Sequence, residues 1–276
     1  MTSTGSTAPA GAGEDLLRRR RGETVLITGA SSGIGRELAR LFAGDGADLV
    51  LIARSEDRLR ELAGELAAEY GVTAQIVPAD LSRPGSPDQI VETLAQQQTD
   101  VDVLVNNAGF GARGPVAGIG VQRQLEMVEV NVAALTRLTA LLLPPMLERR
   151  RGGILNVAST AAFQPGPNSA VYYATKAYVL SFTEALAEEV RGSGVRVSCL
   201  APGPTDTGFA TQAGAVGSRL FRRGVMDAGR VARAGHDGLR RGKTLVIPGL
   251  RNRALAFGVR LSPRVLATKI SGYMQA

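Results

Sequence analysis

Apolar residues along this chain form short continuous runs that alternate with longer segments of helical periodicity. The runs lie at residues 24–28, 48–52, 72–77, 101–105, 154–157, 195–200 and 245–247. Segments with helical spacing separate most of them, at residues 34–43, 55–70, 130–150 and 171–191. Continuous apolar runs are typical of strands covered on both faces, as in a parallel sheet. The pattern therefore predicts an α/β fold with about seven parallel strands and helices on both faces of the sheet.

Length and composition favour one large domain with an addition at each end. The chain has 276 residues, 44% of them hydrophobic. We expect residues 1–22 to form a disordered basic leader rather than a secretory peptide. We expect the α/β domain to span residues 23–249 and a basic amphipathic extension to span residues 250–276. The glycine- and alanine-rich residues 203–229 predict a mobile loop with short helices, placed to act as a lid.

A glycine-rich turn joins the first apolar run to the first helical segment. Its candidate contact residues are Gly29, Ser31, Ser32, Gly33, Ile34 and Gly35. Glycines permit a tight turn and let the backbone approach a pyrophosphate closely, and the following helix points its positive dipole end at that anion. The turn therefore predicts a single-domain, doubly wound Rossmann-type fold that binds a dinucleotide.

The end of the second apolar run predicts which nicotinamide cofactor binds. Proteins that select NAD usually carry an acidic residue there, whereas this run ends at Ala53-Arg54. An arginine matches the oxygens of a 2′-phosphate with its planar group of donors. We therefore expect NADP(H), with Arg54 as the phosphate partner and Ser31 and Ser32 as further donors.

A tyrosine and a lysine open the helical segment at residues 171–191. Tyr172 and Lys176 are four residues apart and so share one helix face. A nearby ammonium lowers the pKa of a phenol, which could then exchange a proton with a substrate oxygen. Ser159 ends the fifth apolar run and could hold that oxygen. Asn131 could carry a water that connects Lys176 to solvent.

Together these features resemble the short-chain dehydrogenase/reductase family over about residues 23–210. The motifs, in order, are Thr28 to Gly35, Asp80-Leu81, Asn106-Asn107-Ala108-Gly109, Asn131, Ser159, Tyr172 with Lys176, and Pro202-Gly203-Pro204-Thr205-Asp206-Thr207. Each motif is common by itself, but the set in this order is specific. Thr205 departs from the family pattern, because many relatives carry Val or Ile there.

The resemblance implies roles for the matching positions. The adenosine end of the cofactor would be contacted by Asp80, Leu81, Asn107, Ala108 and Gly109. The nicotinamide end would be contacted by Pro202, Gly203, Thr205 and Thr207. The catalytic positions would be Asn131, Ser159, Tyr172 and Lys176, of which the last two would also touch the cofactor. The family further implies a homodimer or homotetramer, with residues 130–150 and 171–191 as packing surfaces.

The function expected from this resemblance is the interconversion of a carbonyl and an alcohol by hydride transfer. Phe110, Phe163 and Phe209 lie in the segments that would build the substrate pocket, so an apolar ketone or a 3-oxoacyl compound is expected. Two alternatives stay open, a catalytically silent NADPH-binding sensor and a membrane-surface interaction protein. Arginine clusters without aromatic residues give no specific nucleic-acid signal.

The remaining candidates for chemistry are few. Cys199 is the single cysteine and lies in an apolar run, so we expect a buried structural thiol. His236 is the single histidine; we expect it on the surface of a helix and expect no metal site, which needs several ligands. No apolar run approaches the ~20 residues of a membrane span, so we expect a cytoplasmic protein.

The positive charge of the chain is concentrated near the C-terminus. Residues 219–276 hold 13 basic and 2 acidic residues, whereas residues 1–218 hold 19 basic and 23 acidic ones. As a helix, residues 250–261 would align Leu250, Ala254, Phe257 and Leu261 in one stripe. The stripe could pack on the sheet or on a neighbouring subunit. It could instead contact an anionic membrane, or cover the substrate mouth and attract an acidic carrier.

Overall fold

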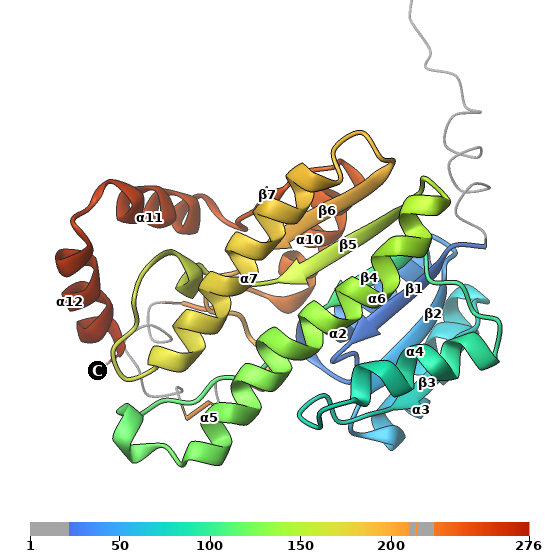
Figure 1. The fold of residues 1–276 in the computed structure, drawn as a ribbon, viewed down its shortest axis with the longest axis horizontal. Coiled ribbons are helices and arrows are strands. Elements are labelled where there is room, and N and C mark those ends of the chain that lie inside the picture. Colours follow the sequence, from blue (N-terminus) through green and yellow to red (C-terminus); the bar gives the residue numbers. More distant parts are fainter. Residues whose placement is uncertain (1–21, 210–212, 215–223, 276) are drawn as a thin grey trace, which may run out of the picture.

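A seven-stranded parallel sheet forms the centre of the molecule (Figure 1). The computed structural model describes residues 22–209, 213–214 and 224–275. The strands are β1 (Thr24–Thr28), β2 (Asp48–Ala53), β3 (Ala74–Pro78), β4 (Val103–Asn106), β5 (Gly152–Val157), β6 (Val195–Leu200) and β7 (Leu245–Val246). Their order, β3-β2-β1-β4-β5-β6-β7, confirms the doubly wound Rossmann-type fold. The order reverses between β1 and β4, where such sheets bind ligands beyond the carboxyl ends of their strands.

Helices cover both faces of the sheet, as the apolar runs predicted. One face packs against α2 (Gly33–Gly44), α3 (Glu56–Tyr70) and α10 (Ala228–Arg240). The other packs against α4 (Ser86–Gln96), α6 (Leu135–Glu148) and α7 (Ala170–Glu189). Strand residues such as Leu26 and Ile27 point to opposite faces and are both fully buried. Covering on both faces explains why the strands are continuously apolar.

Several helices were not predicted from the periodicity, and α10 shows why. Its buried face contains Gly235 and Gly238, which have low helix propensity. A Cβ at Gly235 would lie 2.7 Å from Leu200, and one at Gly238 would collide with Val246. Glycine is therefore needed for the close packing of α10 on the sheet. The periodicity also did not predict that the helical segment at residues 130–150 begins with a π-helical turn, Glu129–Ala134.

The helical stretch Val121–Glu148 is apolar and long enough to cross a membrane by length and composition. Here it comprises α5 (Val121–Val128), the π turn and α6. Leu138, Leu142 and Met146 are buried in the core on one face of the sheet. Because the core helix of a soluble domain passes the same test, this stretch gives no support for a membrane span.

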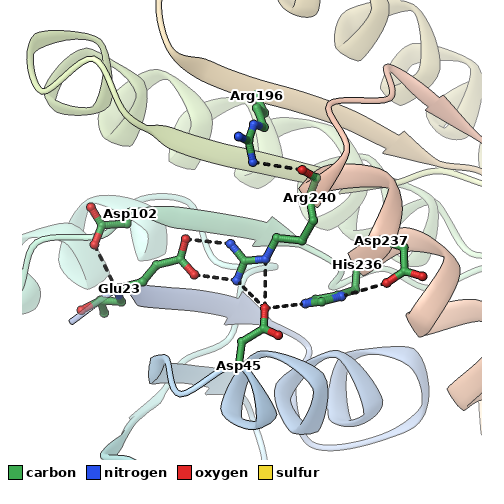
Figure 2. A network of polar contacts seen from close by, with 8 residues as sticks. Glu23, Asp45, Asp102, Arg196, His236, Asp237 and Arg240 are labelled. Carbon is green, nitrogen blue, oxygen red and sulfur yellow. Dashed lines mark hydrogen bonds and ion pairs between the residues drawn. The ribbon is translucent and has the colours of Figure 1, made fainter. Parts of the chain in front are cut away.

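His236 is buried, so its predicted place on a helix surface was wrong. The ring lies on α10 with Nε2 2.9 Å from Asp45 Oδ2. Arg240, one turn later, donates to Glu23 at 2.8 and 2.6 Å and to the same Asp45 oxygen (Figure 2). A buried imidazole is acceptable here because its polar atoms have partners. The network connects α10 with the start of β1 and the end of α2.

The C-terminal residues form α11 (Leu250–Leu261) and α12 (Arg264–Gln275), which extend along one end of the molecule (Figure 1). The expected helix at residues 250–261 is present. Its stripe of Leu250, Phe257 and Leu261 is exposed, which rules out one of the alternatives, packing on the chain's own sheet. Part of the loop expected at residues 203–229 lies outside the described residues, as does the leader. Within the described part, Thr205 pairs with Met226 as an isolated bridge.

Candidate active site

The turn between β1 and α2 has the backbone geometry that its glycines predicted. Gly29 and Gly33 have φ angles of 67° and 54°, in the left-handed region that favours glycine. A Cβ at Gly35 would collide with the carbonyl oxygen of Gly29. Gly35 therefore serves the packing of the turn and does not itself line the cleft, although it was predicted to bind the cofactor. The first amide groups of α2 remain directed at this site.

The end of β4 is tied to the end of β1 by Thr28 and Asn107. The Thr28 hydroxyl oxygen accepts hydrogen bonds of 3.0 Å from the backbone N–H groups of Asn107 and Ala108. The Asn107 side chain returns a hydrogen bond of 2.9 Å to the Thr28 carbonyl. These bonds hold the segment after β4 beside the glycine turn, at the point where the strand order reverses.

A cleft of about 600 Å³ opens at the carboxyl ends of the strands. It brings together nearly all of the predicted site residues, although they are spread over the chain. The predicted cofactor residues in its lining are Gly29, Ser31, Ser32, Gly33, Ile34, Arg54, Asp80, Leu81, Asn107, Ala108, Gly109, Pro202, Gly203, Thr205 and Thr207. The predicted catalytic residues in its lining are Ser159, Tyr172 and Lys176.

The outer end of the cleft carries the groups suited to an adenosine phosphate. Arg54 lies at the tip of β2, and Arg58, which the sequence reasoning missed, lines the cleft from the first turn of α3. The Asp80 carboxylate accepts hydrogen bonds from the backbone and hydroxyl of Ser82 at 3.0 and 2.8 Å. Although burial alone would raise the pKa of Asp80, these hydrogen bonds lower it. Asp80 therefore stays ionised at neutral pH.

Lys176 is buried beneath Tyr172 on the first turns of α7. Its Nζ donates a hydrogen bond of 2.7 Å to the Val157 carbonyl and lies 5.9 Å from the centre of the Tyr172 ring. Burial lowers the pKa of Lys176 to about 8, because the charged form loses its hydration. At neutral pH the side chain is nevertheless mostly protonated.

The electrostatics of Tyr172 differ from the prediction. Burial raises the pKa of the phenol above its ordinary range, although a hydrogen bond with Ser159 lowers it in part. In the chain by itself, the charge of Lys176 does not offset the rise in the pKa of Tyr172. The prediction that this pKa is lowered was therefore wrong for the chain without a cofactor. The reason is desolvation, which disfavours the phenolate more than the hydrogen bond favours it.

Asn131 acts from behind the cleft and does not line it. Its side chain accepts a hydrogen bond of 3.1 Å from the Phe110 N–H and donates bonds of 3.0 Å to the Phe110 carbonyl and to Thr175 Oγ1. A Cβ at Gly109 would lie 3.0 Å from Asn131 Oδ1 and 3.3 Å from Lys176 Nζ. The π turn thus brings Asn131 next to Lys176, where it positions the surrounding backbone. Its role in carrying a water stays a prediction.

Aromatic groups border the catalytic end of the cleft. The Phe209 ring lies 5.3 Å from the Tyr172 ring, and Phe110 also lines the cleft. Phe163 does not line it, contrary to the prediction. It packs on the core beneath β6 and α7, with the Arg260 guanidinium 5.6 Å from its ring.

Other cleft residues were not found from the sequence, because no motif marks them. The charged and polar ones among them include Arg58, Arg113, Arg123, Glu126, Gln164 and Ser169. Arg123 lies 3.9 Å from the centre of the Phe110 ring and 3.6 Å from Glu126. Asn252 of α11 supports the lining from outside, since a Cβ at Gly203 would lie 2.6 Å from its amide nitrogen.

The single cysteine lies outside the cleft. Cys199 is fully buried in β6, as predicted, and burial raises the pKa of its thiol to about 12. It is therefore a poor nucleophile. Among the residues that the structure describes, no three His, Cys, Asp or Glu side chains gather in a way that could hold a metal ion.

Comparison with known proteins identifies the family. Residues 23–215 match the family described as short chain dehydrogenase. A short chain dehydrogenase of Pseudocercospora fijiensis is 37% identical over 201 residues, which are 72% of this chain and 65% of that protein. The chain thus spans about two thirds of the length of this relative.

Solved structures show the same architecture with either cofactor. A short-chain dehydrogenase from Sphingobium yanoikuyae in complex with NADPH superposes with a TM-score of 0.78 at 35% identity, covering 87% of this chain and 94% of that one. A family member from Burkholderia phymatum in complex with NAD has a TM-score of 0.78 at 27% identity, covering 88% and 93%. With the cleft described above, these matches show that the chain is an oxidoreductase of the short-chain dehydrogenase/reductase family.

Proposed function

We propose that this chain is an NADP(H)-dependent reductase of apolar ketones or 3-oxoacyl compounds, with Tyr172 as the proton donor. The observation that carries the proposal is the meeting of Ser159, Tyr172 and Lys176 in one cleft beside the glycine turn. When bound, the nicotinamide cofactor supplies or accepts the hydride. The substrate is a small molecule with a carbonyl or an alcohol group.

Ser159 and Tyr172 have different roles at the substrate oxygen. Ser159 holds that oxygen through its hydroxyl, and Tyr172 donates the proton as hydride reaches the carbonyl carbon. Because burial raises the pKa of Tyr172, the phenol is protonated at neutral pH, which suits the reduction direction. Lys176 binds the cofactor and keeps a positive charge near the phenol. Asn131 positions the backbone around Lys176.

The cleft fits the cofactor at each end. The backbone from Gly29 to Ile34 would hold the pyrophosphate. Gly33 leaves no room for a side chain there, since a Cβ would lie 2.8 Å from Thr207. Arg54, with Arg58, binds the 2′-phosphate. The adenosine is bordered by Asp80, Leu81, Asn107, Ala108 and Gly109, and the nicotinamide by Pro202, Gly203, Thr205 and Thr207. The Thr205 hydroxyl donates to the Gly203 carbonyl at 2.9 Å, so Thr205 serves through its backbone.

The apolar substrate class rests on the catalytic end of the cleft. Phe110, Phe209 and Ala161 border it, and Gln164 supplies an uncharged polar group. A cytoplasmic location and a homo-oligomeric state complete the proposal. The silent-sensor alternative has no observation in its favour, because each catalytic position carries a competent side chain.

The test of the mechanism is the Tyr172→Phe variant. We expect it to fold, to bind NADPH and to lose ~10²–10⁴ in turnover, because the proton donor is removed with little change in volume. A panel of aldehydes and ketones with NADPH, followed by cofactor absorbance, supplies the measurement. Tyr178→Phe is the control, since its hydroxyl lies 2.9 Å from Thr136 on the outside of α7. Near-normal turnover by Tyr172→Phe would refute the role.

The test of the cofactor preference is the Arg54→Asp variant. We expect the NADPH affinity to fall by about 10- to 100-fold, because one charged hydrogen-bonding partner is worth roughly 1.5–3 kcal/mol. Affinities for NADPH and NADH are measured by fluorescence titration of both proteins. Preference of the unmodified chain for NADH would contradict the assignment of Arg54.

A further inference from the structure

Asn252, in the first turn of α11, points toward the body of the molecule, whereas the apolar stripe of α11 points away from it. Helical spacing places Asn252 one turn before the buried Ala256 and on the side opposite Leu250 and Phe257. The family match covers residues 23–215, so Asn252 lies beyond the matched part of the chain. Its contacts, rather than a family motif, therefore indicate what it does.

The side-chain amide of Asn252 is held in place by two partners. Its Nδ2 donates a hydrogen bond of 2.8 Å to the Pro248 carbonyl and lies 3.3 Å from Met226 Sδ, which is a weaker acceptor. A side-chain amide has two N–H donors, and each has a partner here. The amide is thus fixed in orientation, although it lies at the end of a side chain.

The fixed amide lies directly against Gly203. The three atoms nearest to a Cβ at Gly203 all belong to Asn252, namely Nδ2 at 2.6 Å, Oδ1 at 2.8 Å and Cγ at 2.9 Å. The φ angle of Gly203 is not in the left-handed region, so this angle does not itself require glycine. The contact with Asn252 therefore restricts position 203 to glycine.

Met226 gives Asn252 a second connection to the same backbone segment, residues 202–206. The Pro204 carbonyl accepts a hydrogen bond of 2.8 Å from the Met226 N–H. Met226 thus holds the segment through its backbone and contacts Asn252 through its sulfur. A shift of the Asn252 amide would act on the segment directly at Gly203 and indirectly through Met226.

The other side of this segment faces the cleft. Pro202, Gly203 and Thr205 line the cleft, whereas Asn252 does not. The wall at Gly203 therefore consists of backbone alone, with the cleft on one side and the amide of Asn252 on the other. Because a displacement of about 1 Å remote from the reacting atoms can lower turnover about a hundredfold, the position of this wall bears on the reaction.

We propose that Asn252 is a positioning residue for the nicotinamide end of the cofactor site. It sets the place of Gly203 from outside the cleft and so makes the first turn of α11 part of the cofactor site. This inference rests on the proposed function, because it takes the nicotinamide to lie beside residues 202–207. Loss of the Asn252 amide should then affect the nicotinamide half of the cofactor and not the adenosine half, which lies beside Arg54.

The experiment compares how the full-length chain binds NADPH and adenosine 2′,5′-bisphosphate, which is the adenosine end of the cofactor without the nicotinamide. Isothermal titration calorimetry measures both affinities. Asn252→Ala should weaken NADPH binding by about three- to tenfold, the usual effect of one hydrogen-bonding side chain, and leave the bisphosphate affinity unchanged. Arg253→Ala is the matched control. It removes a hydrogen bond of 2.9 Å from the same turn of α11 to the Ile247 carbonyl but keeps the amide beside Gly203, so both affinities should be unchanged.

An exchange of side-chain size at the contact gives a second, independent result. Gly203→Ala should weaken NADPH binding by at least about tenfold, since the added Cβ collides with the amide. Adding Asn252→Ala to this variant should restore the affinity to that of Asn252→Ala alone, because the shorter side chain frees the space. Such non-additive effects are expected of two residues in contact.

Three results would overturn the positioning role. They are an unchanged NADPH affinity in Asn252→Ala, equal losses for NADPH and the bisphosphate, and penalties that add in the double variant. Equal losses would show that Asn252 only stabilises the fold. An unmodified chain that binds neither NADPH nor NADH would refute the proposed function and this role together. Preference for NADH would correct the cofactor choice alone, and the same comparison is then made with NADH and ADP.

Discussion

Helices α2 and α11 have the same length and opposite surroundings. Each contains 12 residues with an apolar stripe. In α2 the stripe of Leu38, Ala39 and Phe42 is fully buried against the sheet, whereas in α11 only Ala256 is buried and Phe257 faces outward. A stripe thus shows which face of a helix favours burial, but it does not show whether the same chain provides the cover.

The two regions also differ in how closely their positively charged side chains are paired with carboxylates. Arg240, in the body, is neutralised by Glu23 and Asp45 within hydrogen-bond distance (Figure 2). Helices α11 and α12 carry five cations and no acidic residue of their own, and Arg260 pairs with Glu184 of α7 only at 3.7 Å, on an exposed surface. Internal pairing stabilises a fold, whereas a surplus of one sign on an exposed apolar surface favours a partner of opposite sign.

The largest difference should appear when one phenylalanine is removed from each region. Phe42→Ala should lower the free energy of unfolding by ~3–5 kcal/mol, because it leaves a cavity in the core. Phe257→Ala should change it by less than ~0.5 kcal/mol in dilute protein, where the exposed ring has no core to lose. Urea denaturation followed by circular dichroism gives both values. Equal losses would show that Phe257 is buried within its own chain.

A second pair of variants compares the arginines. Arg240→Met should destabilise the chain by about 3 kcal/mol, because the partly buried carboxylates of Glu23 and Asp45 both lose the guanidinium that donates to them. Arg264→Met, in the exposed first turn of α12, should have an effect within ~0.5 kcal/mol. The same urea titrations measure both. A neutral Arg240→Met would mean that solvent reaches the two carboxylates and replaces the guanidinium.

The smallest expected effect is a pH dependence carried by Lys176. Burial lowers its pKa in the folded chain to about 8, below the value of 10.5 for a free side chain. Between these two values the unfolded chain binds more protons than the folded one, so the free energy of unfolding should rise with pH from about 8 toward 10. The raised pKa values of Cys199, from about pH 9, and of Tyr172, above pH 10, act in the opposite direction, because the unfolded thiol and phenol ionise first.

Stability curves of the cofactor-free protein between pH 7 and 10 measure this rise. Lys176→Met should remove this rise, whereas Lys269→Met in α12 should leave it unchanged. A rise that persists in Lys176→Met would assign the pH dependence to another group.

The sequence alone determined the fold class, the order of the strands along the chain and most of the residues that line the cleft. Continuous apolar runs marked the strands because both faces of the sheet are covered, and the glycines of residues 29–35 marked the turn because backbone geometry requires them there. Tyr172, Lys176 and Ser159 were found because their chemistry is tied to short spacings and to strand ends.

Tertiary structure decided the features that depend on surroundings rather than on spacing. His236 is buried because Asp45 and Asp237 lie within hydrogen-bond reach. Phe163 lies outside the cleft because it packs on the apolar cluster beside β6 and α7, under the Arg260 guanidinium. The pKa of Tyr172 rises because packing removes water from the phenol. The apolar stripe of α11 is exposed because none of the described residues covers Leu250, Phe257 or Leu261. Periodicity records which residues favour burial, but burial itself depends on what the folded chain, or a second copy, places beside them.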